Sequence, residues 1–223
     1  MKKTNKKAYK KIALVLSLFA VIIWLVLGTG ASLAWFTDTS NEVNNIFHFS
    51  DFNFKVSHEL TDGNWEEVDS QTKIFDENAL YEPGYVQVVY LKTENLGSLD
   101  LKLSTTVNVN GCSESYNVFG QRFMLYDHLK FGITISDTYE EMKESVADRA
   151  TAVSIATEPL QRYYDPSKYF EVGADTIEGG KAKYIALVIQ MPKEVNNVAN
   201  YRGDTVPHLE LGLTLKAEQT QNR

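Results

Sequence analysis

The residues of this chain that could do metal chemistry are its four histidines: His48, His58, His128 and His208. A zinc-protease helix carries the pattern H-E-x-x-H, in which two imidazoles one helical turn apart bind the same ion. Here His58-Glu59 is followed by Leu60-Thr61-Asp62, so an aspartate stands where the second histidine is needed. The segment Asp62-Gly63-Asn64 is typical of a turn after a strand rather than of a helix. We therefore expect no catalytic zinc site.

Nucleophilic catalysis finds no better support. The lone cysteine lies in Gly111-Cys112-Ser113, which lacks the glycine pattern of a nucleophile elbow and has no histidine close in sequence. Two acidic groups could bind calcium in a secreted protein, but neither has the spacing of an EF-hand loop, and acidic surfaces facing solvent explain both. They are Glu66, Glu67 and Asp69, and Asp137, Glu140 and Glu141. The sequence predicts a protein that is not an enzyme and has no cofactor.

Two surface features leave a binding role open. Arg202-Gly203-Asp204 is an integrin-recognition tripeptide in a predicted turn, although three residues match by chance easily. A group of four aromatic residues could stack on sugar rings, or could equally pack a long connection against the core. These residues are Tyr163, Tyr164, Tyr169 and Phe170.

The first 34 residues predict a secretory signal. Lysines between Lys2 and Lys11 are followed by the uncharged run 12–34, and Ser32 and Ala34 are the small residues that a signal peptidase requires. We expect cleavage between Ala34 and Trp35. A retained anchor is the alternative, because the apolar run approaches the length of a spanning helix if the Gly28-Thr29-Gly30 stretch is included. In that case the uncleaved signal would be the only contact with the membrane.

The remaining 189 residues suit one domain with a substantial core. All six lysines of the signal lie in the first 34 residues, so the rest carries 16 basic and 29 acidic residues, a formal net charge of −13. An acidic surface repels phosphate backbones, so we expect no nucleic-acid partner. A single cysteine can form no intramolecular disulfide, and the fold must depend on packing.

Period-two alternation dominates the chain and predicts strands with one buried face. The clearest is the run in which Leu209, Leu211, Leu213 and Leu215 alternate with polar or small residues. About seven further strands are predicted: 52–56, 73–75, 85–93, 99–103, 105–110, 129–135 and a central strand over 184–191. A capping-box-like start at Asp137 predicts one amphipathic helix over 138–156, with Met142, Val146, Ala150 and Val153 on its apolar stripe.

Turn residues separate these elements. Pro83-Gly84 suits a type II turn, and Asn95-Leu96-Gly97-Ser98 predicts a tight hairpin. The segment from Tyr163 to Gly180 predicts an irregular connection. Many strands with one inserted helix predict an all-β fold, a two-sheet sandwich.

The chain resembles the TasA and camelysin (CalY) family of secreted bacterial proteins, whose signals are cut by a SipW-type signal peptidase. The resemblance rests on four features in this order: the junction Leu33 to Asp38, the strand 52–56, the segment from Glu82-Pro83-Gly84 through Asn95-Leu96-Gly97-Ser98, and Ile189-Gln190-Met191-Pro192 before the leucine strand. It implies a jelly-roll-like sandwich, export from a Gram-positive bacterium, and a role as a subunit of extracellular matrix or cell-surface (biofilm) fibres. The loop Asn200-Tyr201-Arg202-Gly203 and the helix over 138–156 depart from the family.

These predictions divide the chain into a signal (1–34), an N-terminal arm (35–49), a sandwich domain (50–219) and a polar tail (220–223). The arm carries apolar side chains between polar ones, so it needs a partner: Trp35, Phe36, Ile46, Phe47 and Phe49. It can fold back on its own sandwich or add a strand to a neighbouring copy, which would give a filament. An accessory matrix protein is a further conceivable partner. The alternatives are a monomeric secreted adhesin and a camelysin-like metallopeptidase.

Overall fold

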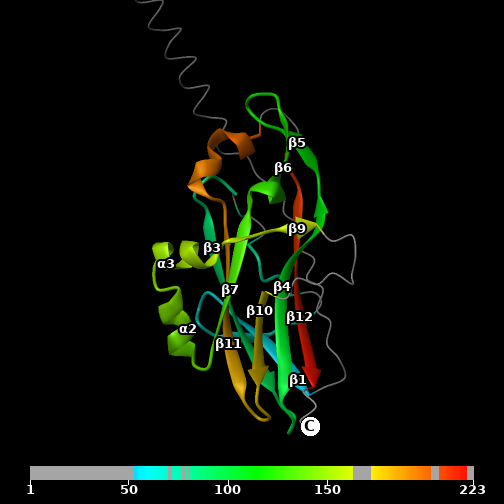
Figure 1. Ribbon diagram of the computed structural model, residues 1–223, viewed down its shortest axis with the longest axis vertical. Helices are drawn as coiled ribbons and strands as arrows, with labels where there is room; N and C mark the ends of the chain where they lie inside the picture. The colour runs from blue at the N-terminus through cyan, green and yellow to red at the C-terminus, as the bar shows by residue number, and fades with distance from the viewer. Residues whose placement is uncertain are drawn as a thin grey trace, which may run out of the picture. The chain divides into compact units, whose positions relative to one another are not determined.

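A computed structural model describes residues 53–69, 72–76, 79, 81–162, 172–201 and 206–219. The larger sheet, sheet A, contains six antiparallel strands in the order β2-β1-β3-β11-β7-β8. Their bounds are β1 Phe54–Glu59, β2 Trp65–Glu67, β3 Val86–Asn95, β7 Lys130–Ser136, β8 Glu158–Pro159 and β11 Ala182–Gln190. Strands β1, β3, β7 and β11 of this sheet are labelled in Figure 1. Strand β11 lies inside the sheet and is apolar enough to be buried on both faces, as the sequence predicted.

The smaller sheet, sheet B, has the order β10-β4-β12, and a short strand β9 pairs with β4 in parallel. These strands are β4 Leu101–Cys112, β9 Gln161–Arg162, β10 Val172–Ile177 and β12 Leu209–Gln219. A two-stranded ribbon of β5 Glu114–Tyr116 and β6 Arg122–Met124 follows β4. The chain crosses from sheet A to sheet B between β3 and β4. It crosses from sheet B to sheet A between β10 and β11, and back to sheet B between β11 and β12. The predicted all-β, jelly-roll-like sandwich is confirmed.

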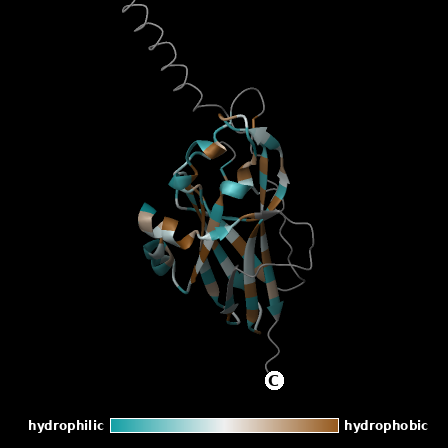
Figure 2. Cartoon of the chain, turned by 45° about the horizontal axis from the view of Figure 1, so that its top comes forward, coloured by the Kyte–Doolittle hydropathy of each residue, from teal (hydrophilic) through white to brown (hydrophobic). Residues whose placement is uncertain are grey.

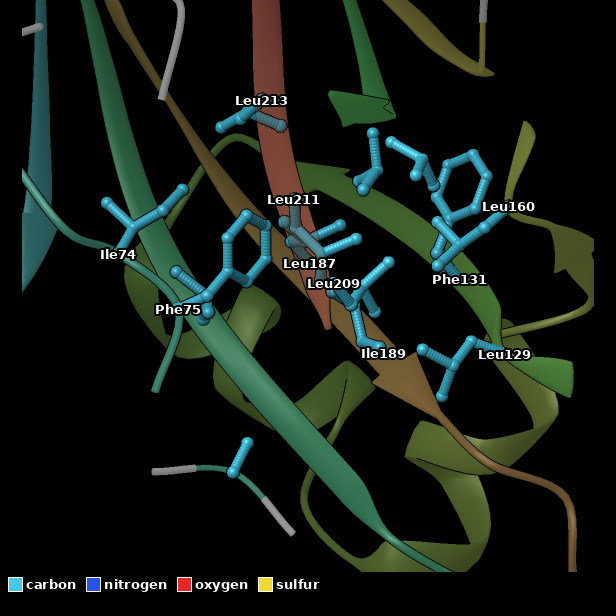
Figure 3. Packing of buried hydrophobic residues seen from close by; sticks show 14 of the residues in the cluster. Ile74, Phe75, Leu129, Phe131, Leu160, Leu187, Ile189, Leu209, Leu211 and Leu213 are labelled. Carbon is cyan, nitrogen blue, oxygen red and sulfur yellow. The ribbon is translucent and has the colours of Figure 1, made fainter. Parts of the chain in front are cut away.

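The core lies between the sheets, and its side chains come from both (Figure 3). Leu187 and Ile189 of sheet A and Leu211 and Leu213 of sheet B are at most 1% exposed. Hydrophilic and hydrophobic residues alternate along the strands, as period-two burial requires (Figure 2). All four predicted leucines of β12 face this core, which confirms the clearest pattern in the sequence.

The predicted helix over 138–156 is wrong as a single element. Two helices occupy the segment, α2 Tyr139–Ser145 and α3 Arg149–Ile155, and each begins with its own capping box. The first box joins Thr138 and Glu141, one residue later than predicted; the second uses Asp148, whose extended backbone (φ −136°, ψ 170°) ends any continuous helix. The break shifts the apolar stripe. Met142 and Val146 are buried as predicted, whereas Ala150 is exposed and Ala152 takes its place.

Both helices cover the outer face of sheet A, the face that points away from the core (Figure 1). Two residues of the sheet allow the close approach. A Cβ on Gly132 would overlap the carbonyl oxygen of Ile155, so only glycine lets α3 lie this near to β7. The Gln190 side chain donates hydrogen bonds to the carbonyl oxygens of Val153 (3.0 Å) and Ala156 (2.7 Å), which satisfies the carboxyl end of α3.

The predicted hairpin around Gly97 is also wrong. Strands β3 and β4 flank this segment but lie in different sheets, so it is a crossover. Asn95 organises it: its side chain donates to the carbonyl oxygens of Leu99 (2.7 Å) and Ile177 (3.1 Å) and accepts from the Gly97 amide. Leu99, predicted to be a buried strand residue, precedes β4 and is 54% exposed. The Pro83-Gly84 turn is confirmed, because the Tyr85 amide donates to Glu82 and Gly84 has a φ of +94°.

Three other predicted strands and one predicted irregular segment need correction. Residues 73–75 form no strand, although Ile74 and Phe75 are buried in the core. The two predicted strands over 99–103 and 105–110 are parts of one long strand, β4. The predicted irregular segment from Tyr163 to Gly180 contains β10, which pairs with β4. The 3-10 helices η2 Leu125–His128 and η3 Lys193–Ala199 complete the described elements.

Candidate functional site

The long outer strand of sheet B is the feature of this fold best suited to binding another chain. Strand β12 spans 11 residues and pairs along its whole length with β4, while its other side has no partner strand among the described residues. The backbone groups on the outer side of an edge strand are a template for pairing with an added strand. The outer strands of sheet A, β2 and β8, have only three and two residues.

Strand β12 is held rigidly from one side. Its register with β4 runs from the Leu209–Cys112 pair to the Gln219–Leu101 pair, with one irregularity between Glu210 and Leu211. Its leucines are at most 1% exposed, so the core fixes the strand while its outer backbone edge keeps its own hydrogen-bonding groups. The edge is therefore presented by a strand that the fold already orders.

Charged side chains discourage pairing with another strand along only part of the β12 edge. Natural sheets guard long edges with charged side chains, especially lysine. In β12 the charges lie at the two ends: Glu210 near the start, and Lys216 and Glu218 near the end. The Lys216 ammonium lies 2.7 Å from Glu218, and this hydrogen bond lowers the pKa of the Glu218 carboxyl. The stretch from Leu211 to Leu215 carries no charge, so no charged side chain opposes strand pairing in the middle of the edge.

The residues predicted for cleavage and assembly lie outside the described residues. These are Ser32, Ala34 and Trp35 at the junction, and Trp35, Phe36, Ile46, Phe47 and Phe49 in the arm. The aromatic segment from Tyr163 to Phe170 and the Arg202-Gly203-Asp204 tripeptide lie outside them as well. No helix among the described residues is both long enough and apolar enough to cross a membrane.

The histidine nearest to a protease motif is part of a strand. His58 lies in β1 and Asp62 lies in the following turn, where its carboxylate accepts from the Asn64 backbone and side chain. The His58 Nε2 atom is 3.5 Å from the Glu66 carboxylate of β2. Burial lowers the pKa of His58, and Glu66 only partly offsets this. Within the described part of the chain, no group of three histidine, cysteine or acidic residues is placed to hold a metal ion.

The other polar residues near Cys112 make structural contacts. The backbone amide of His208 donates to the Ser113 hydroxyl (2.8 Å), and the His208 ring lies 3.1 Å from Glu210. Ser113 therefore meets the backbone of His208, and no contact joins its hydroxyl to the imidazole ring in the described structure. Cys112 is half-buried at the end of β4.

Four of the six acidic residues considered for calcium face a basic side chain or cap a helix. Glu66 faces His58, Glu67 lies 3.2 Å from Lys55, and Asp137 lies 2.6 Å from Lys183. Lysine partners compensate the charges of Glu67 and Asp137, and Glu141 completes the capping box that begins α2. The arrangement supports a charged surface rather than a shared ion site.

One cluster was not anticipated from the sequence. Lys143 of α2 lies 3.4 Å from the centre of the Tyr90 ring and 2.7 Å from Glu59, which also accepts from the Tyr139 hydroxyl at 2.6 Å. Trp65, Tyr139 and Tyr184 surround it with mutual edge-to-face contacts at 5.9–6.1 Å. The spacing of Tyr139 and Lys143, four residues apart, was the available signal, because residues so spaced share a helix face. We call these six residues the lysine latch; it attaches α2 to sheet A.

The described residues thus define an all-β protein of two packed sheets, and the smaller sheet ends in a long outermost described strand, β12. No protein-family model matches the chain, and no curated protein matches it. Among solved structures, the chain is similar to the ASH / PapD-like domain of human CEP192 (PapD-like domain 7). The identity is 12%, the match covers 64% of this chain and 78% of that chain, and the TM-score is 0.23. A likeness at this level indicates no function.

Proposed function

We propose that this protein is a secreted structural subunit of extracellular matrix or cell-surface fibres. A SipW-type signal peptidase would release the mature chain after Ala34. The N-terminal arm of one subunit, residues 35–49, would then pair with β12 of the next. The observation that carries the proposal is the position of β12, which is the outermost described strand of sheet B, spans 11 residues and carries no charge from Leu211 to Leu215.

Strand addition suits the chemistry of both partners. Backbone hydrogen bonds along the edge supply affinity, and side-chain contacts supply register. The arm offers Ile46, Phe47 and Phe49 among asparagines and threonines, a composition that can pair as a strand and bury apolar groups. Each subunit has one arm and one β12 edge at different places, so the contact is head-to-tail and generates an open filament.

Electron microscopy of the mature chain tests the proposal directly. We expect fibres from residues 35–223, and none from a variant in which Trp35, Phe36, Ile46, Phe47 and Phe49 are all changed to serine. Circular dichroism must show that the variant keeps its sheets, so that lost assembly is not lost folding. A peptide of residues 35–49 should slow fibre growth by occupying β12, and a scrambled peptide of equal composition should not.

The result that contradicts the proposal is a mature chain that stays monomeric and fibre-free at every concentration and pH tried. A monomeric adhesin would then be the better hypothesis. Fibres that form only when a second secreted protein is added would keep the proposal and identify an accessory matrix protein.

A further inference from the structure

The outer face of sheet B, which points away from the core, is polar yet buried. The residues that form it are Ser104, Thr106 and Asn108 of β4, with Gly212 and Thr214 of β12. Their polar members are only 6–8% exposed. We call this set the polar floor. The register places Asn108 beside Gly212 and Thr106 beside Thr214, so the floor is continuous across the two strands.

No described helix or strand covers the polar floor. Helices α2 and α3 pack on sheet A, and η2 and η3 pack against each other and against β6. Helix η2 also contacts β4, and its buried Leu125 belongs to the core between the sheets. Strand β9 pairs with β4 edge to edge rather than face to face. Further along the same face, Lys216 and Glu218 keep side chains that are 48% and 49% exposed. The burial is therefore local. The Asn110 side chain lies over Gly212 at one end of the floor, and the rest of the floor needs a covering segment of limited width.

One atom of the floor indicates what that segment must offer. The Asn108 amide nitrogen donates to the Thr214 hydroxyl at 2.6 Å, which fixes the orientation of the side chain. The amide oxygen is buried and has no hydrogen-bond donor among the described residues. Buried acceptors of this kind are nearly always satisfied, so the cover must bring an N–H or O–H group to it.

The described chain begins in the right place to provide such a cover. The carbonyl oxygen of Asn53 accepts from the Leu96 amide at 2.7 Å, at the end of the sandwich where β3 ends and β4 begins. Strand β12 ends there too, because Gln219 pairs with Leu101. Residues 38–52, if extended, reach about 50 Å, whereas the whole of β4 is about 40 Å long. They can therefore cross the floor from this end.

We propose that residues 38–52 dock on the polar floor of their own sandwich in the free subunit. The asparagines, serines and threonines among them carry the donors that the Asn108 oxygen requires: Thr39, Ser40, Asn41, Asn44 and Asn45. This contact goes beyond the proposed function, because it concerns the monomer and holds whether or not fibres form. Where fibres do form, docking in the same subunit competes with donation of the arm to a neighbour.

Chymotrypsin digestion of the mature monomer tests the proposal, with light scattering to confirm the monomeric state and mass spectrometry to locate cuts. The bonds after Phe47 and Phe49 should be protected in the native chain. The variant T214R places a large charge in the floor, and we expect it to raise cleavage at these bonds at least ten-fold. The matched control is E218R, which adds the same side chain to the exposed part of the same face and should leave the rate unchanged.

Either of two results from the comparison of the native chain with T214R overturns the proposal. One is cleavage after Phe47 and Phe49 as fast in the native monomer as in T214R. The other is that T214R newly exposes bonds between residues 163 and 171 while the arm stays as it was, which would identify that segment as the cover. If circular dichroism shows that T214R has lost its sheets, the variant N108L replaces it in the test. N108L removes the buried acceptor, so we expect cleavage of the arm to rise several-fold. An unchanged cleavage rate in N108L contradicts the docking. Fibre growth is scored separately, so either proposal can fail alone.

Discussion

The two sheets of this sandwich differ in the length of their outer strands and in what covers their outer faces. Sheet A has short outer strands, and two helices cover its outer face. Sheet B ends, among the described strands, in the 11-residue β12, and it has a polar floor that no described helix or strand covers. Both sheets contribute to one core. The difference separates two tasks: sheet A completes the fold of the single chain, and sheet B presents backbone and polar groups that a further segment can use.

The largest effects should be equal in the two sheets, because they share the core. We expect L187A in β11 and L213A in β12 each to lower the free energy of unfolding by about 2–5 kcal/mol, since both side chains are fully buried. Urea denaturation measures the loss. If L213A lowers the free energy of unfolding by less than about 1 kcal/mol while L187A lowers it by the expected amount, sheet B contributes little to the shared core.

The next prediction concerns the cover of sheet A. In G132A the new methyl group overlaps the carbonyl oxygen of Ile155, so α3 must move away from β7. We expect a loss of about 1–3 kcal/mol, typical of overpacking. T134A, on the same face of β7, adds no atoms and serves as the control. Faster amide exchange in α3 than in β12 should accompany the loss in G132A; exchange that increases equally in both sheets would contradict a separate cover.

The hydrophobic pattern of the sequence predicted the strands that are buried on alternate residues or on both faces. Strand β12 buries alternate leucines, and β11 contains the continuous apolar run from Tyr184 to Ile189, so both could be predicted from the sequence pattern. Strand β10 could not, because its pairing with β4 depends on a neighbour distant in sequence. The break between α2 and α3 depends on Asp148 acting as a cap rather than as a helix residue, a local competition that an apolar stripe does not show.

The candidate site was predictable only in part. The leucine pattern of β12 indicated a strand with one buried face, but strand order decides whether that strand is central or outermost. Asn95 shows the same limit: the turn residues at 95–98 predicted a hairpin, but the Asn95 side chain donates to the carbonyl oxygens of Leu99 and Ile177, and the chain crosses to the other sheet. The polar floor has no signature at all, because serine, threonine and asparagine on an outer face normally indicate solvent.

A smaller effect should follow from opening the lysine latch. K143M keeps much of the side-chain volume but removes the ammonium from the Tyr90 ring and from Glu59. We expect a loss of about 1–2 kcal/mol, and higher amide exchange in α2, because the cation–π contact and the ion pair both disappear. K181M, at an exposed lysine, should change stability by less than about 0.5 kcal/mol. Equal effects of the two variants would show that the latch does not stabilise α2.

The smallest effect is a pH dependence located at the edge of sheet A. Burial lowers the pKa of His58 below 6.5, so the unfolded chain binds a proton there more readily than the folded chain does. The contribution of His58 to stability is therefore complete above pH 6.5 and is lost as the pH falls from 6.5 through the lowered pKa. His128 behaves in the same way, because burial lowers its pKa too. H58Q and H128Q, compared with the native chain in urea denaturation between pH 5 and 7, separate the two residues. If H58Q leaves the slope of stability against pH unchanged, the β1–β2 edge is open to water, and the contrast between a closed sheet A and an open sheet B loses one of its supports.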